Sequence, residues 1–80
     1  MKKKKGEPDI CERFGFAVKS RREVLGLTQE ELAHRAKIHR TYLSDVERGT
    51  RNLSLVNIER LSIALDLSLA ALFAFLDKSV

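Results

Sequence analysis

Residues 28–46 read TQEELAHRAKIHRTYLSDV, from Thr28 to Val46. Residue types that favour burial recur at helical spacing in two short segments of this stretch, at Leu32, Ala33, Ile38, Leu43 and Val46. Too few residues separate the segments for a loop, so the second helix must leave the first at a steep angle. The stretch therefore predicts a helix-turn-helix, in which one face of the second helix projects outward.

The residues around the start of this stretch carry signals for helix ends. Gly26 suits the C-terminal cap of a first helix over about residues 10–25, because glycine adopts the left-handed conformation at little cost. Thr28 and Glu31 are spaced as a capping box, in which each side chain accepts a hydrogen bond from the other residue's amide. The second helix is therefore expected to begin directly after Thr28.

Three further helices are predicted downstream. The third covers about residues 40–47 and ends before Gly49, the fourth follows Ser54, and the fifth follows Ser68 over about residues 69–76. The apolar stripe of the fourth helix is expected at Leu55, Ile58, Leu61, Ile63 and Leu65. Five helices and no strand signal predict an all-α domain over residues 9–80, with the helix-turn-helix at the second and third helices.

The charge of the chain is unevenly placed along its 80 residues. There are 15 basic and 11 acidic residues, and Lys2 to Lys5 alone account for the net charge of +4. An acidic partner must therefore be attracted by the distribution of charge on the folded domain rather than by its total. The basic residues near the helix pair are Lys19, Arg21, Arg22, Lys37, Arg40, Arg48 and Arg51.

Residues 1–8 are expected to form a flexible basic arm, whose lysines either contact phosphates or serve as a solubilising tail. Cys11 is the only cysteine, so no intramolecular disulfide can form. No secretory signal is present, and the apolar run over residues 67–76 is shorter than the ~20 residues that span a bilayer. These observations predict a cytoplasmic protein without a membrane segment.

The sequence shows no pattern for catalysis or metal binding. Ser20, His34 and Asp45 include the residue types of a catalytic triad, but nothing in the sequence brings them together. His34 and His39 have a spacing that suits neither a metal site nor one face of a helix. We therefore expect no enzymatic activity, no cofactor, no metal site and no small-molecule ligand.

The chain from Phe14 to Phe73 resembles the phage repressor and Cro-type helix-turn-helix family, on the segments GLTQEELA (26–33), ERG (47–49), LSL (53–55) and ALF (71–73). More narrowly, HRTYL (39–43) with ERGTRN (47–52) is similar to the controller proteins of restriction–modification systems. Lys37 departs from the family, which usually has a left-handed glycine in this turn; a non-glycine residue there costs on the order of 1 kcal/mol. A second departure is Asn52–Leu53, where many relatives have a proline before the serine cap.

The outward face of the third helix is expected to read DNA bases in the major groove. Arg40 can donate to O6 and N7 of one guanine, which is worth about 1–3 kcal/mol of discrimination. Thr41 can offer its methyl group to thymine or its hydroxyl to a phosphate, and Ser44 lies one turn further on. Asp45 either accepts from the amino group of cytosine or orients Arg48; repulsion from phosphates favours the orienting role.

The resemblance implies further contacts to the DNA backbone. It assigns a phosphate contact to Gln29 at the start of the second helix. It assigns the sugar-phosphate backbone to Arg48, Arg51 and Asn52, which follow the third helix. The predicted DNA-binding residues are Thr28, Gln29, His39, Arg40, Thr41, Tyr42, Ser44, Asp45, Arg48, Arg51 and Asn52.

Two of these residues have alternative roles that stay open at this stage. Tyr42 either stacks or binds a phosphate through its hydroxyl, or it is a half-buried packing residue. His39 either contacts a phosphate or simply caps the third helix, although histidine is a mediocre N-cap. The resemblance also pairs Glu47 with Arg22, as a partly buried ion pair that ties the third helix to the first.

The predicted last helix is apolar around its whole circumference, from Leu69 to Leu76. One side, including Leu72, is expected to cover the core, and the remaining apolar surface needs a partner. The expected homodimer interface consists of Leu69, Phe73, Phe75 and Leu76. A twofold dimer would read two half-sites of a palindromic operator, about 34–36 Å apart on double-stranded DNA.

These features predict a homodimeric transcriptional regulator, and the narrower resemblance favours a restriction–modification controller protein. The alternative is an antitoxin whose main partner is a toxin protein. An antitoxin is expected to carry a tail that wraps its toxin, whereas only residues 77–80 follow the predicted last helix. The gene neighbours would discriminate between the two, since a methyltransferase and nuclease indicate the first and a toxin the second.

Overall fold

The computed structural model describes residues 6–78 of the chain. These residues form five helices and no strand: α1 (Ile10–Val24), α2 (Gln29–Ala36), α3 (Arg40–Glu47), α4 (Leu55–Ala64) and α5 (Leu69–Lys78). The predicted all-α class and the order of the helices are confirmed, and α3 has the predicted bounds. The lysines of the predicted basic arm lie outside the described residues, so the arm stays a prediction.

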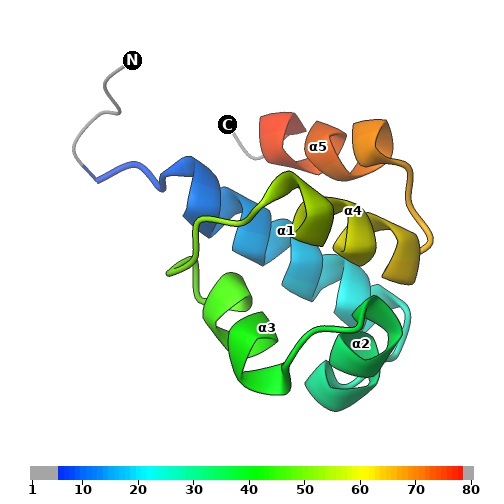
Figure 1. Ribbon diagram of the computed structural model, residues 1–80. Coiled ribbons are helices and arrows are strands. Elements are labelled where there is room, and N and C mark those ends of the chain that lie inside the picture. Colours follow the sequence, from blue (N-terminus) through cyan, green and yellow to red (C-terminus); the bar gives the residue numbers. More distant parts are fainter. Residues whose placement is uncertain (1–5, 79–80) are drawn as a thin grey trace.

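The helices pack around α1, which contacts α3 and α5 (Figure 1). The helix-turn-helix pair, α2 and α3, lies along one side of α1, and α5 covers the opposite side of the molecule. α4 contacts both α2 and α5, so it joins the helix-turn-helix to the last helix. α3 is thus held on a compact base while one of its sides faces outward.

The core is built largely from leucines that come from every helix except α1. Leu32, Leu43, Leu61, Leu65 and Leu72 are each fully buried, and α1 adds Phe14, Ala17 and Val18. Burying one such leucine stabilises the fold by about 1.5–3 kcal/mol. These side chains therefore fix the positions of the helices relative to one another.

The predicted apolar stripe of α4 is wrong at two positions. Leu55 is 83% exposed and Ile63 is 68% exposed, whereas Leu61 is fully buried. Leu55 is the first residue of α4, and Ile63 is rotated by roughly 200° from Leu61 at about 100° per residue. The buried side of α4 instead includes Leu61, Ser62 and Ala64.

Two capping boxes begin the first two helices. The predicted box of α2 is confirmed: the Thr28 amide donates to Glu31 (2.9 Å), and the Glu31 amide donates to the Thr28 hydroxyl (3.1 Å). Asp9 and Glu12 form an equivalent box at the start of α1, which the sequence analysis missed. In both boxes the side chains satisfy amides that have no partner within the helix.

The turn between α2 and α3 passes through Lys37, which has a φ of 58° and a ψ of 42°. This confirms the left-handed conformation that was expected at this departure from the family pattern. The amide of Ile38 donates to the carbonyl of Ala33 (3.0 Å), as in the turn after α1, where Leu27 donates to Arg22 (3.1 Å). Both turns therefore end a helix with the same hydrogen-bond pattern.

Gly15 and Gly49 let α1 approach the end of α3 closely. A Cβ atom at Gly15 would lie 2.9 Å from the carbonyl oxygen of Glu47 and still closer to that of Val46. Gly49, at a φ of 80°, would place a Cβ atom 2.7 Å from Cα of Glu12. No side chain fits at either point without moving backbone, so the two glycines set the distance between α1 and α3.

We expect Gly15→Ala to destabilise the domain although alanine favours helices. Overpacking costs about 1–3 kcal/mol, which exceeds the roughly 1 kcal/mol that alanine gains in helix propensity. Urea denaturation followed by circular dichroism would measure the loss. Lys19→Ala on the exposed side of α1 is the control, and equal stability of the two variants would contradict the close approach.

Candidate nucleic-acid interface

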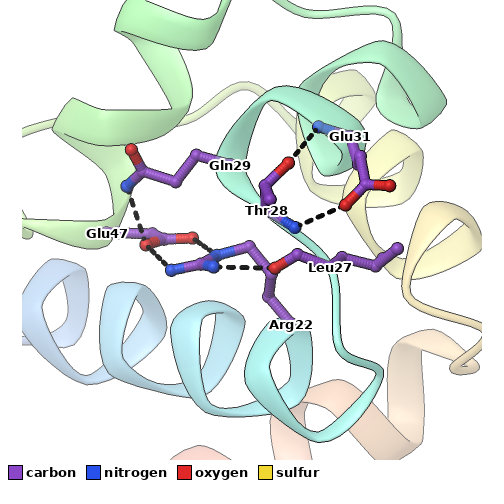
Figure 2. Close-up of polar contacts among 6 residues, drawn as sticks. All are labelled: Arg22, Leu27, Thr28, Gln29, Glu31 and Glu47. Carbon is purple, nitrogen blue, oxygen red and sulfur yellow. Dashed lines mark hydrogen bonds and ion pairs between the residues drawn. The ribbon is translucent and has the colours of Figure 1, made fainter.

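A buried ion pair fixes the C-terminal end of the recognition helix α3. The guanidinium of Arg22 on α1 donates two hydrogen bonds to the carboxylate of Glu47, at 2.7 and 3.0 Å (Figure 2). The side chains of Arg22 and Glu47 are only 12% and 4% exposed. The predicted pair between α1 and α3 is confirmed, and its bidentate geometry fixes angle as well as distance.

The same pair also holds the start of α2. Arg22 donates a third hydrogen bond to the carbonyl oxygen of Leu27 (2.8 Å), just before the Thr28 cap. The side-chain amide of Gln29 donates to Glu47 (3.0 Å), as Figure 2 shows. One carboxylate therefore ties together α1, the first residue of α2 and the last residue of α3.

Two pKa shifts accompany these contacts. The hydrogen bonds that Arg22 donates to Glu47 raise the pKa of Arg22 above its ordinary value, against the opposing effect of burial. The guanidinium of Arg22 therefore stays charged in this buried position. Hydrogen bonds from the amide and then the hydroxyl of Thr28 lower the pKa of Glu31. This capping contribution is present above the ordinary pKa of glutamate and is lost as the pH falls through the lowered value.

The N-terminal end of α3 presents three exposed polar residues, His39, Arg40 and Thr41. Within residues 6–78, Arg40 has neither an ion-pair nor a hydrogen-bond partner, so its guanidinium is available to a ligand. His39 is the N-cap residue of α3, but its side chain makes no capping hydrogen bond. The capping alternative for His39 is therefore wrong, and its phosphate contact stays a prediction.

The C-terminal half of α3 carries a cluster of polar side chains around Asp45. The carboxylate of Asp45 pairs with Arg48, and it also accepts a hydrogen bond from Nε of Arg51 at 3.3 Å. A second nitrogen of Arg48 donates to the hydroxyl of Ser44 at 2.9 Å. The predicted orienting role of Asp45 toward Arg48 is confirmed, and the additional contact to Arg51 was not foreseen.

Tyr42 is half-buried on the side of α3 that faces α4. Its hydroxyl accepts a hydrogen bond from the side-chain amide of Asn57 at 3.2 Å, and the guanidinium of Arg51 lies 5.0 Å from its ring centroid. The structure thus favours the packing role over free stacking. The phenol hydrogen remains able to donate to a phosphate. Asn57 was missed because no local pattern marks it.

Three other residues that were predicted to bind DNA lie outside α3. Thr28 is exposed and its hydroxyl caps α2, while Gln29 is half-buried with its amide on Glu47. The side-chain amide of Gln29 keeps one hydrogen that a phosphate oxygen can accept. Asn52 is exposed in the segment between α3 and α4. The contacts of all three with DNA stay predictions.

The predicted basic cluster is smaller than expected. Arg22 is neutralised by Glu47, and Nε of Arg21 donates to the carbonyl oxygen of Leu65 at the end of α4, at 3.0 Å. These two arginines of α1 therefore hold other helices, and neither is fully exposed. The positive charge near α3 comes from Lys37, Arg40, Arg48 and Arg51, with Asp45 among them.

The two flanks of α5 beside its buried stripe are apolar and partly open to solvent. Leu69 and Phe75 are each 41% exposed and Phe73 is 38% exposed, while Leu72 is fully buried as predicted. Leu76 is only 3% exposed, so its assignment to a dimer interface is wrong. Leu76 lies one helical turn after Leu72 and packs into the same core. Phe73 and Phe75 are about 200° apart around the helix, so they lie on the two flanks of the buried Leu72 and Leu76. We call the exposed apolar surface of these two flanks, formed by Leu69, Phe73 and Phe75, the α5 face.

Comparison with known proteins agrees with this geometry. Residues 18–72 match the helix-turn-helix family. The chain belongs to that family. Control protein C.MunI from Mycoplasma sp is 44% identical to it over 71 residues, which make up 88% of this chain and 96% of C.MunI. The predicted resemblance to repressors and controller proteins is thereby confirmed.

Two solved structures of helix-turn-helix proteins extend the comparison. The restriction–modification controller protein C.AhdI from Aeromonas hydrophila has a TM-score of 0.76 at 44% identity, over 79% of this chain and 96% of that one. The controller protein C.Esp1396I, a tetramer in complex with its natural 35 base-pair operator, has a TM-score of 0.83 at 35% identity. That match covers 90% of this chain and 95% of C.Esp1396I. Within residues 6–78, no helix has both the length and the apolar character needed to cross a membrane.

We expect Glu47→Gln to lower the free energy of unfolding by about 2–4 kcal/mol, because it leaves the buried charge of Arg22 without a counter-charge. Urea denaturation would measure the loss, with Glu59→Gln on the exposed side of α4 as the control. Replacing both partners, as Arg22→Met with Glu47→Met, should regain most of the stability because no buried charge remains. If Glu47→Gln has the same free energy of unfolding as the control Glu59→Gln, the structural role of the pair is contradicted.

Proposed function

We propose that this chain is a sequence-specific DNA-binding transcriptional regulator, of the controller-protein kind, that acts as a homodimer on a palindromic operator. The observation that carries the proposal is the presentation of α3. Its C-terminal end is fixed by the buried pair of Arg22 and Glu47, while Arg40 at its N-terminal end is exposed and unpaired among the described residues. Its controller-protein relatives favour this function over an antitoxin.

On DNA, the N-terminal end of α3 enters the major groove in this proposal. Arg40 donates to O6 and N7 of a guanine, and Thr41 contacts a neighbouring base or phosphate. Arg48, Arg51 and Asn52 grip the backbone beyond the end of α3 and fix the register of the helix without reading sequence. The regulator needs no cofactor and no catalysis for this, and it works in the cytoplasm, where the DNA is.

The dimer in this proposal forms through the α5 face. Its three exposed apolar side chains, Leu69, Phe73 and Phe75, are costly to leave in water. A twofold axis through this face makes the interface self-complementary and presents two copies of α3 to the same side of the DNA. Because one half-site binds weakly, joining two of them gives so small a domain its specificity.

Because Arg40 and Arg51 have separate roles, replacing each with alanine should change DNA binding in a different way. Arg40→Ala should flatten the preference for operator over random DNA, because only a base contact carries sequence information. Arg51→Ala should weaken both about equally and make the salt dependence shallower by about 1 in the log–log slope. Anisotropy titrations at several salt concentrations would measure both effects. An unchanged specificity ratio for Arg40→Ala would remove Arg40 as the base reader.

Phe75→Glu tests the dimer, since it places a carboxylate on the α5 face without touching the buried Leu72. A buried, unpaired carboxylate costs several kcal/mol, roughly doubled by the twofold symmetry. We expect a monomer in sedimentation, loss of operator binding and unchanged helical circular dichroism. Phe16→Glu is the control, because Phe16 is 65% exposed on α1, outside the α5 face. A Phe75→Glu dimer that binds the full site would overturn the interface.

A further inference from the structure

Asp45 holds both of the arginines that the proposed function assigns to phosphates. Its two carboxylate oxygens are divided between them: Oδ1 pairs with Arg48, and Oδ2 accepts from Arg51 at 3.3 Å. The side chain of Asp45 is 19% exposed, whereas those of Arg48 and Arg51 are 62% and 48% exposed. Asp45 is therefore the shielded member of the cluster, and the two arginine side chains are the ones exposed to solvent.

The rest of the cluster keeps the arginines in these positions. Ser44 accepts from Arg48 at 2.9 Å, and the ring of Tyr42 lies beneath the guanidinium of Arg51. Thr50 donates to the backbone oxygen of Asp45 through both its amide and its hydroxyl, each at 3.1 Å. The segment between the arginines is thus anchored independently of the carboxylate, and removing only the charge of Asp45 leaves that anchor in place.

A phosphate that takes the N–H groups now bound to Asp45 must compete with that carboxylate. Contacting the DNA backbone through those N–H groups costs the two ion pairs with Asp45, and the carboxylate itself repels phosphates. Once the arginines have moved, the carboxylate is left facing the DNA without a donor, which is costly in a desolvated interface. Only a base that offers an amino group to α3, such as cytosine through N4, can replace the lost hydrogen bonds.

We propose that Asp45 is a specificity-determining residue, which restrains Arg48 and Arg51 and so suppresses binding to DNA that offers no amino group opposite it. This inference rests on the proposed function, because it needs α3 to lie in the major groove. Binding to random DNA breaks the ion pairs and makes no new hydrogen bond to Asp45. Binding to the operator breaks the same ion pairs, but a base contact to Asp45 offsets that cost. The acid therefore weakens random binding more than operator binding.

The test uses the full chain and a duplex that the wild type itself selects from a random pool, with a scrambled duplex of equal composition. For Asp45→Asn, we expect affinity for the scrambled duplex to rise roughly tenfold at 0.1 M salt, with a slope steeper by about 0.9, as for one more neutralised phosphate. Affinity for the selected duplex should change less than about twofold, because the lost contact offsets the lost repulsion.

Asp66→Asn is the matched control. It makes the same change of charge at an exposed residue between α4 and α5, whose φ of 57° asparagine tolerates well. It should leave both affinities and the salt slope unchanged. Circular dichroism melts establish that both variants are folded before the titrations are compared.

Three results would overturn the proposal. An equal gain on both duplexes would make Asp45 a general repulsive charge, and a loss on both would make it necessary for positioning the arginines. An unchanged affinity for the scrambled duplex would show that Asp45 does not restrain them. If the wild type enriches no sequence from the pool, the proposed function fails first, and that failure is seen before any variant is made.

Discussion

The buried ion pair between Arg22 and Glu47 is the contact on which the outward presentation of α3 depends. A buried pair of this kind contributes little net stability, since desolvation offsets much of the attraction. Its geometry is nevertheless demanding, because each charge is costly without the other. Gln29 and the carbonyl of Leu27 complete the hydrogen bonding of the pair. The pair therefore specifies one orientation of the recognition helix rather than simply strengthening the core.

Close packing of backbone makes this orientation rigid. The carbonyl oxygens of Val46 and Glu47 lie against Gly15, and Gly49 lies against Glu12, so α1 touches the end of α3 without an intervening side chain. An ion pair alone tolerates some rotation, but a backbone contact does not. The pair sets the angle of α3 and the glycines set its distance from α1, and together they leave its first turn free to meet a ligand.

Features that depend on neighbours in the sequence could be predicted, and those that depend on distant packing could not. The Thr28–Glu31 box follows from signals a few residues apart, whereas the left-handed Lys37 and the Arg22–Glu47 pair followed from the family resemblance. Gly15 carries no such signal, because its need for space comes from Val46 and Glu47, which lie far from it in the sequence. For Leu76, a helix apolar all round does not reveal which side the core takes.

The surface of the folded domain is shaped by which arginines have internal partners. Arg21 holds α4 through a backbone carbonyl, and Arg22 holds α3 through the carboxylate of Glu47, which cancels the charge of Arg22 in the field that DNA would meet. Among the residues described around α3, Arg40 keeps its whole charge, while Arg48 and Arg51 share theirs with Asp45. A reader built this way attracts DNA weakly through charge in general and depends on the contacts of α3 for its affinity. The near-neutral total charge of the domain is then a means to selectivity, since strong random binding would compete with every operator.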